Sequence, residues 1–147
     1  MAEKRYPNAD LIIKHPYLKS RSQEVRAASL VLADLAYRNK NSAGIVSIDP
    51  RSLSRKLSVT TDDAHAILDI LAADKRGPWA HHHRPDSGVD RPMMLRDHFV
   101  IPGGKMPSDA DVLAVKAEAE RTLAATRDAH EAARLRAIRR AQRQSGW

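Results

Sequence analysis

The most reactive side chains in the sequence belong to three consecutive histidines, His81, His82 and His83. On an extended strand the first and third imidazoles point to the same side, so these two could share a metal ion with Asp97 or His98 across a hairpin. The spacing fixes no further ligand, however, and histidines in such a place also suit contacts with phosphates. We therefore expect neither a metal site nor a cofactor.

The residue patterns of common enzymes are missing from the sequence. The nearest approach to a phosphate-binding P-loop is residues 102–106, PGGKM, which lack its spacing and its Ser or Thr. There is no Gly-x-Ser-x-Gly, no His-Glu-x-x-His and no cysteine that could act as a nucleophile or form a disulfide. A nuclease that uses His83 and Asp86 is an enzymatic alternative, but nothing orients those two groups. We expect a protein that is not an enzyme.

The overall charge favours a polyanionic partner. Twenty-five Lys and Arg against 18 Asp and Glu give the 147 residues a net charge of +7. No apolar run approaches the roughly 20 residues that span a bilayer, and the start, MAEKRYPNAD, lacks a signal-peptide core. The absence of cysteine fits a reducing compartment. We therefore expect a cytoplasmic protein without a membrane partner, although basic side chains also occur on surfaces that bind nothing.

Two short helices are predicted near the middle of the chain. Asp49 and Pro50 form a strong helix start, and Leu53 and Leu57 lie four residues apart on one face of a helix over 50–57. The next three residues break the pattern. Thr60 and Asp63 then have the spacing of a capping box, which predicts a second helix over 61–74.

Two short helices joined by a brief turn with an apolar residue, here Val59, form a helix-turn-helix pattern. At this point the sequence resembles the winged helix-turn-helix domains of bacterial and phage regulators and replication proteins. With its flanking elements the resemblance covers roughly residues 22–100. It rests on Leu53, Leu57, Val59, Thr60, Ile67 and Leu71.

The flanking segments agree with such a domain. Ser20 and Gln23 have a capping-box spacing that predicts a helix over 22–39, and the β-branched residues 45–48 predict the first strand. In a winged domain this strand pairs with the later wing. The wing itself is expected to be a hairpin with strands at 79–83 and 93–100, separated by the turn-rich residues 84–90.

The predicted fold is mostly α with a small β wing: a winged helix-turn-helix domain, residues 22–101, plus a long C-terminal helix. Residues 1–21 are expected to form a basic N-terminal arm with one strand or helical turn docked on the body. A linker, residues 102–108, leads to an alanine- and arginine-rich helix over 109–144. Because this helix lacks a clean heptad, we expect it to fold partly back on the domain or dock on a partner.

The charge of the second helix argues against ordinary base reading. The resemblance implies that helix 61–74 enters the major groove. Its exposed positions are Thr61, Asp62, His65 and Asp69, and it contains no Lys, Arg, Asn or Gln. Carboxylates repel the phosphates that supply most of the affinity for DNA. Only Thr61, His65 and Asp62 are therefore expected to face the bases.

Positive charge is expected to reach the phosphates from several other segments. The helix over 50–57 positions the backbone, the wing holds the neighbouring groove, and the end of the C-terminal helix adds arginines. The N-terminal arm is a further segment that could follow DNA. The predicted DNA-binding residues are Arg51, Arg55, Lys56, Thr61, His65, Arg84, Arg91, Arg136, Arg139, Arg140 and Arg143.

These features predict a non-enzymatic protein that binds duplex DNA and regulates transcription or replication in a bacterium or phage. One alternative is a protein-binding winged-helix assembly module, because an acidic second helix suits a basic partner. Another is a small subunit of a larger nucleoprotein complex. The C-terminal helix could bind a protein partner, a second copy of the chain or nucleic acid.

Overall fold

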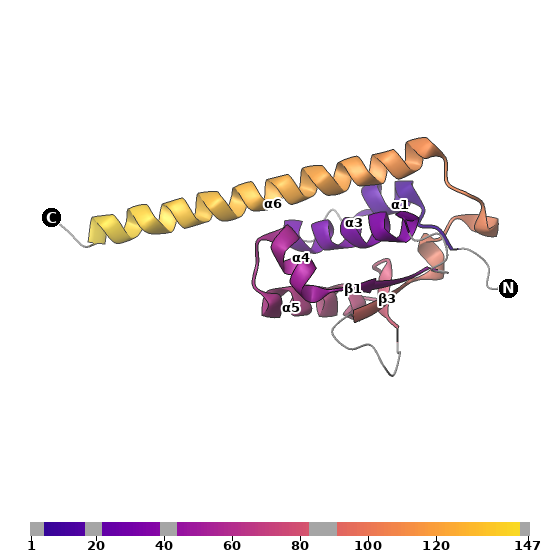
Figure 1. Ribbon diagram of the computed structural model, residues 1–147, viewed down its shortest axis with the longest axis horizontal. Helices are drawn as coiled ribbons and strands as arrows, with labels where there is room; N and C mark the ends of the chain where they lie inside the picture. Colours follow the sequence, from indigo (N-terminus) through magenta and orange to yellow (C-terminus); the bar gives the residue numbers. More distant parts are fainter. Residues whose placement is uncertain (1–4, 17–21, 39–43, 83–90, 145–147) are drawn as a thin grey trace.

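The computed structural model describes residues 5–16, 22–38, 44–82 and 91–144. Its helices pack above and to one side of a small sheet, and one long helix runs across the molecule (Figure 1). The helices are α1 (Ala9–Lys14), α3 (Gln23–Arg38), α4 (Pro50–Leu57), α5 (Thr61–Ala73) and α6 (Asp109–Gln144). The strands are β1 (Ile45–Ile48), β2 (Trp79–His81) and β3 (Arg91–Leu95), and two 3-10 turns, η1 (Asp97–Phe99) and η2 (Pro102–Gly104), follow.

The three strands form one antiparallel sheet in the order β1-β3-β2. Val46 pairs with Met93, and Ala80 pairs with Met94 on the other side of β3. The first strand therefore joins the sheet through the last one, as predicted. The fold class is confirmed: mostly helical, with a small sheet and a long C-terminal helix.

Helix α3 is the centre of the core. It packs between α6 and α1 on one side and α5 and β1 on the other (Figure 1). Leu30, Leu32 and Ala33 in its middle are fully buried. From the sheet, Trp79 enters the same core, and its indole Nε1 donates a hydrogen bond to the hydroxyl of Ser29 at 3.2 Å. This bond satisfies two polar groups that water does not reach.

The turn between α4 and α5 explains why the helical pattern breaks at residue 58. Ser58 has a left-handed backbone, with φ of 57° and ψ of 43°. Its amide donates to the carbonyl of Arg55, and the amide of Val59 donates to the carbonyl of Ser54 at 3.0 Å. This pair of hydrogen bonds closes a helix and reverses the chain. The left-handed residue in such a turn is usually glycine. Both predicted caps are confirmed: Asp49 accepts from the amide of Arg51, and Thr60 from the amide of Asp63.

The N-terminal residues belong to the body from residue 5 onward. Tyr6, Ala9 and Ile12 are buried, and the amide of Asn8 donates to the carbonyl of Phe99 at 2.8 Å. The predicted docked helical turn is therefore confirmed as α1. The hydroxyl of Tyr37 donates to a backbone carbonyl of this segment, and burial raises the pKa of the Tyr37 phenol.

Several predicted boundaries differ from the structure: α5 ends at Ala73, β2 ends at His81 and β3 begins at Arg91. Helix α3 begins at Gln23, and Ser22 accepts a hydrogen bond from the amide of Val25, so Ser22 caps it; Ser20 lies outside the described residues. The last strand ends at Leu95, and the predicted extension to residue 100 is wrong. The reason lies in the next side chain, Arg96.

Arg96 leaves the sheet to satisfy the end of α5. Its guanidinium donates to the carbonyl of Ala72 at 2.9 Å, to that of Gly77 at 3.1 Å and also to that of Asp74. The last carbonyls of a helix have no partner within it, and α5 has no basic residue in its last turn. Arg96 supplies both the donors and the positive charge, and the chain then turns at η1 to bury Phe99.

The predicted bounds of the C-terminal helix, 109–144, are confirmed. Its first part folds back on the body: Val115 and Ala119 are buried, and Glu118 forms an ion pair with Arg26 of α3 at 3.1 Å. Every residue from 131 to 144 is exposed, and this segment projects beyond the body (Figure 1). None of the helices in the described part of the chain combines the length and apolarity that a membrane crossing needs.

Candidate nucleic-acid interface

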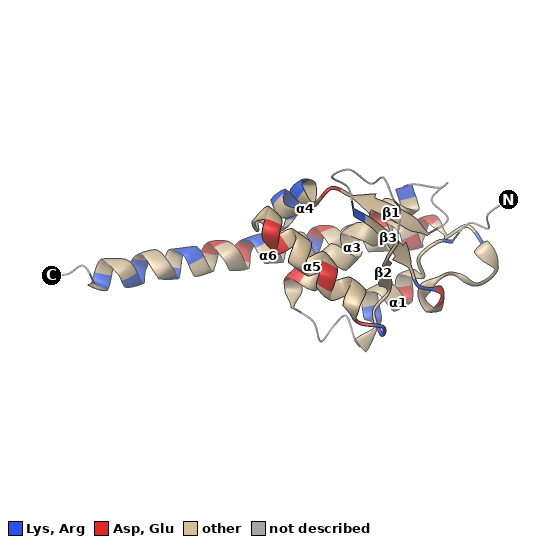
Figure 2. Ribbon diagram, turned by 90° about the horizontal axis from the view of Figure 1, so that it is seen from below, with Lys and Arg blue, Asp and Glu red and all other residues tan. Residues whose placement is uncertain are grey.

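Helix α4 presents a purely basic outer face. Its Leu53 and Leu57 are fully buried, which turns Arg51, Arg55 and Lys56 toward solvent. Figure 2 shows the basic residues of α4 in blue. The Arg51 guanidinium lies 3.5 Å from the carboxylate that caps the helix. Within the described part of the chain, Arg55 and Lys56 lie within ion-pair distance of no carboxylate. These two cations are therefore available to an external anion.

Helix α5 presents an acidic outer face. It buries a continuous apolar side against the core, formed by Ala64, Ile67, Leu68, Leu71 and Ala72. Thr61, Asp62 and Asp63 are exposed at its start, and Asp69 is exposed near its end. Figure 2 shows the acidic residues of α5 in red. Two aspartates in the first turn stabilise the helix dipole. The same charges would repel a phosphate backbone that approached this helix.

Arg91, predicted as a wing contact to DNA, is held by partners on α5. Its guanidinium forms an ion pair with Asp69 and donates to the backbone carbonyl of His65 at 3.0 Å. The His81 imidazole lies 3.4 Å from both the Arg91 guanidinium and the Asp69 carboxylate. Only 21% of the Arg91 side chain is exposed. This arginine ties β3 to α5, and the half-buried His65 belongs to the same contact.

The free end of α6 carries the densest positive charge. Residues 131–144 contain five arginines and a single acid, Glu131. All five arginines are exposed, and no carboxylate of the described residues lies within ion-pair distance of them. The guanidinium-bearing residues Arg136, Arg139, Arg140 and Arg143 surround a small surface hollow of about 260 Å³. Such a hollow between like charges suits an anion such as a phosphate.

The structure brings the predicted DNA-binding cations of α4 and the arginines of α6 to one end of the molecule. The other predicted DNA-binding residues that the structure describes do not join them. In both views α4 lies at the end of the body from which the arginine-rich segment of α6 projects (Figures 1 and 2). Thr61 lies on the neighbouring acidic helix, and Arg91 is paired internally. Arg84 lies outside the described residues.

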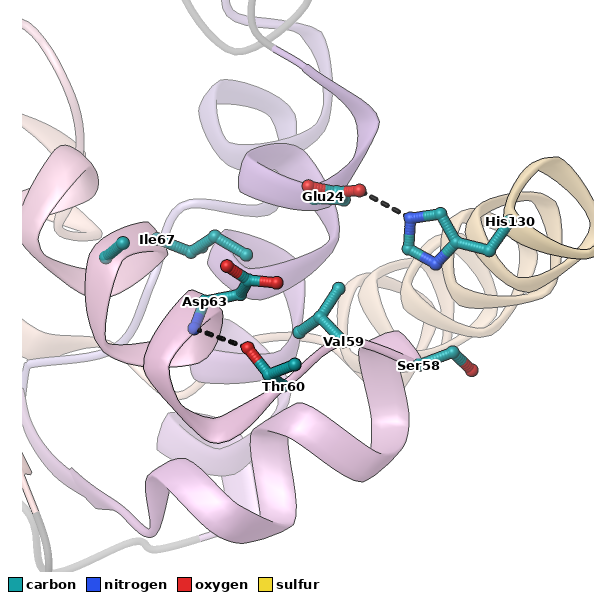
Figure 3. Close-up of a pocket in the computed structure, with 8 residues that line it drawn as sticks. Glu24, Ser58, Val59, Thr60, Asp63, Ile67 and His130 are labelled. Atoms are coloured by element: carbon teal, nitrogen blue, oxygen red, sulfur yellow. Dashed lines mark hydrogen bonds and ion pairs between the residues drawn. The ribbon is translucent and has the colours of Figure 1, made fainter. Parts of the chain in front are cut away.

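An open hollow of about 580 Å³ lies where α6 leaves the body. The turn before α5 forms one wall, with Val59 and Thr60, while Asp63 and Ile67 of α5 form another (Figure 3). At the rim, His130 of α6 lies 2.5 Å from a carboxylate oxygen of Glu24 in α3. The hollow therefore combines apolar walls with two carboxylates, a chemistry that suits a basic side chain with an aliphatic stem.

The metal-binding alternative finds no support in the geometry. In the sheet, His81 is opposite Met93, so Asp97 and His98 lie beyond the end of the strand. Asp97 is paired with Arg5 instead. Within the described residues there is no group of three or more potential ligands that could hold a metal ion. His83 and Asp86, the alternative nuclease pair, lie outside the described residues.

Sequence reasoning missed the roles of Asp69 and Arg96. Both act through partners about 20 residues away in the chain, at contacts set by how β3 lies against α5. The absence of any basic residue in the last turn of α5 was the available signal for Arg96.

Comparisons of the chain with protein-family models, with curated proteins and with solved structures found no match.

Proposed function

We propose that this protein is a non-enzymatic DNA-binding protein that holds the phosphate backbone of duplex DNA with α4 and the free end of α6. The observation that carries the proposal is the grouping of unpaired cations, Arg55 and Lys56 on α4 and the five arginines of residues 131–144, at one end of the molecule. Such a surface binds through counterion release and with little dependence on base sequence. Regulation of transcription or replication in a bacterium or phage is the setting that we propose.

Helix α5 has a secondary part in this proposal. Its start can reach a base only where phosphates are held away from Asp62 and Asp63, and Thr61 is the exposed hydroxyl there. Carboxylates accept hydrogen bonds from cytosine amino groups, so a contact of this kind would be selective but weak. The cations of α4 and α6 would supply the affinity.

The test is binding to random-sequence duplex DNA across a salt series. The full-length protein is compared with a variant in which Arg136, Arg139, Arg140 and Arg143 are replaced by Gln. Since each lost phosphate contact flattens the plot of log affinity against log salt by about 0.9, we expect the slope to fall by about 3 to 4. An unchanged slope would remove α6 from the interface, and no binding at low salt would overturn the proposal.

The variant needs a matched control and an intact fold. Lys105 follows η2 and Lys116 lies on the part of α6 that packs on the body, and both are exposed. Replacing both by Gln should change the slope little. Substitutions are preferable to a truncation before α6, because that helix contributes Val115 and Ala119 to the core. Its removal would expose buried apolar surface of α3.

A second candidate function is a protein-binding assembly module. The acidic outer face of α5 favours it, because a helix without free cations is a poor partner for DNA and a suitable one for a basic protein segment. In this alternative the protein would be a subunit of a larger nucleoprotein complex.

A further inference from the structure

Helix α5 has an apolar strip within its acidic outer face. Ile70 is 47% exposed although it is a large apolar residue, and Ala66 and Ala73 lie four residues before and three after it, on the same face. The small alanines leave room for another backbone to approach closely. Asp62 and Asp69 border the strip on one side and Asp63 on the other.

The free end of α6 carries a complementary strip. Leu135 is 44% exposed and Ile138 is 47% exposed, and their spacing of three residues places them on one face. Arg134 and Arg139 border this pair on either side. An apolar strip with acidic borders thus has a shorter counterpart with basic borders.

The two strips of one molecule cannot meet. Helix α6 is continuous over 36 residues, and its free end points away from the body (Figure 1). Helix α5 lies on the far side of α3 from α6 (Figure 1). Contact between the strips therefore requires a second molecule.

Charge determines the direction in which the two helices would run. When Leu135 and Ile138 lie on Ile70, an antiparallel arrangement brings Arg139 and Arg143 toward the acidic start of α5. A parallel arrangement would bring Asp128 and Glu131 to the same place, against Asp62 and Asp63. The antiparallel arrangement also pairs the helix dipoles favourably.

We propose that residues 131–144 of one molecule dock antiparallel on the outer face of α5 of a second molecule. The docking rests on the second candidate function, in which α5 binds protein, and it names a second copy of this chain as the partner. The docked segment ends beside the hollow in Figure 3, where the stem of Arg143 would lie on Val59 and its guanidinium would face Asp63 and Glu24.

The contact is head-to-tail, and this sets the form of the assembly. Each molecule has one α5 face and one α6 end, so association extends into open chains unless a ring closes. Two short helices bury less surface than a standard interface, and we expect dissociation constants on the order of 100 µM. Salt should weaken the contact, because at about 0.5 M the Debye length falls to roughly 4 Å.

The test mixes two full-length variants that each lack one half of the contact. Ile70→Asp damages the α5 strip, and Leu135→Asp with Ile138→Asp damages the α6 strip. Sedimentation velocity should show growing oligomers for the unchanged protein and a monomer for each variant alone. A mixture should give a one-to-one complex that grows no further, because only one intact pair of surfaces is present. A mixture that stays monomeric would overturn the proposal, as would an unchanged protein that stays monomeric.

A control and a second pair of variants separate surface effects from folding. Leu113 is 63% exposed on the anchored part of α6, so Leu113→Asp should leave association intact. Asp62→Lys with Asp63→Lys should abolish association, and adding Arg139→Glu and Arg143→Glu to the same chain should restore it. A failed rescue would contradict the antiparallel arrangement.

The mixing experiment contains no nucleic acid, so it is independent of DNA binding. Absence of self-association would leave the salt slope of DNA binding unchanged. If both proposals hold, arginines of residues 131–144 take part in DNA binding and in docking on α5. Added duplex DNA should then dissociate the oligomers.

Discussion

Helices α4 and α5 are joined by a three-residue turn that begins at the left-handed Ser58, yet their outer faces carry opposite charge. Helix α4 exposes Arg51, Arg55 and Lys56 and no acid, whereas α5 exposes three aspartates and no Lys or Arg. Both bury leucines at helical spacing in the same core. The hydrophobic pattern therefore fixes how the two helices pack, and the outward positions remain free to serve different partners.

Reversing the charge of α5 should have the largest effect. Asp62→Lys with Asp63→Lys would make α5 resemble α4, and we expect affinity for random duplex DNA at low salt to rise about tenfold or more. The salt slope should steepen by about 2 if both lysines reach phosphates. Fluorescence anisotropy across a salt series measures both quantities. No change in either would mean that α5 faces away from bound DNA.

Removing charge from α4 should have the next largest effect. Arg55→Ala with Lys56→Ala is expected to weaken DNA binding about fivefold and to flatten the salt slope by about 2, because two phosphate contacts are lost. The effect should be the same for every DNA sequence. Lys105→Ala with Lys116→Ala removes equal charge elsewhere and serves as the control. An equal loss in the control would show that only net charge matters.

Arg91 should behave as a structural residue. Arg91→Ala would break the bridge from β3 to Asp69 and the backbone of His65, and we expect the free energy of unfolding to fall by about 1 kcal/mol. DNA affinity should change less than about twofold, since this guanidinium is already paired. Denaturant unfolding measures the loss of stability, and the anisotropy assay measures the change in DNA affinity. A large loss of DNA affinity with unchanged stability would show that Arg91 contacts DNA.

Substitutions at Ser58 in the turn should have the smallest effect, a small change in stability. Ser58 adopts a left-handed conformation that suits glycine, so Ser58→Gly should stabilise the protein by about 0.5 kcal/mol. Thermal unfolding would show a slightly higher midpoint. Ser58→Val is the matched opposite, because a β-branched residue at this φ is strained and should lower the midpoint. A midpoint that falls for both would mean that the serine hydroxyl contributes to the turn.

Local signals predicted most of the fold. The caps at Asp49 and Thr60 and the bounds of α4 and α6 follow from side chains within a few residues of each helix end. The end of β3 did not follow from local pattern, because Phe99 is buried from a 3-10 turn and Arg96 leaves the sheet to cap α5. Tertiary contact overrides strand propensity there.

In the candidate site, too, some features follow from local sequence and others depend on tertiary contacts. Exposure of Arg55 and Lys56 followed from Leu53 and Leu57, since burying two positions of a helix fixes which face remains outside. The pairing of Arg91 with an aspartate 22 residues earlier depends on how β3 lies against α5, and no spacing rule predicts it.

The half-anchored state of α6 has a consequence for motion. The first part of α6 packs on the body, where Val115 and Ala119 are buried, whereas the last 14 residues of the helix are all exposed, and a helical segment of that length is marginally stable in water. Amide hydrogens should therefore exchange slowly up to about His130 and quickly beyond it. A partner of this end, whether DNA or another molecule of the protein, must order a fraying segment, which lowers its affinity and speeds its release.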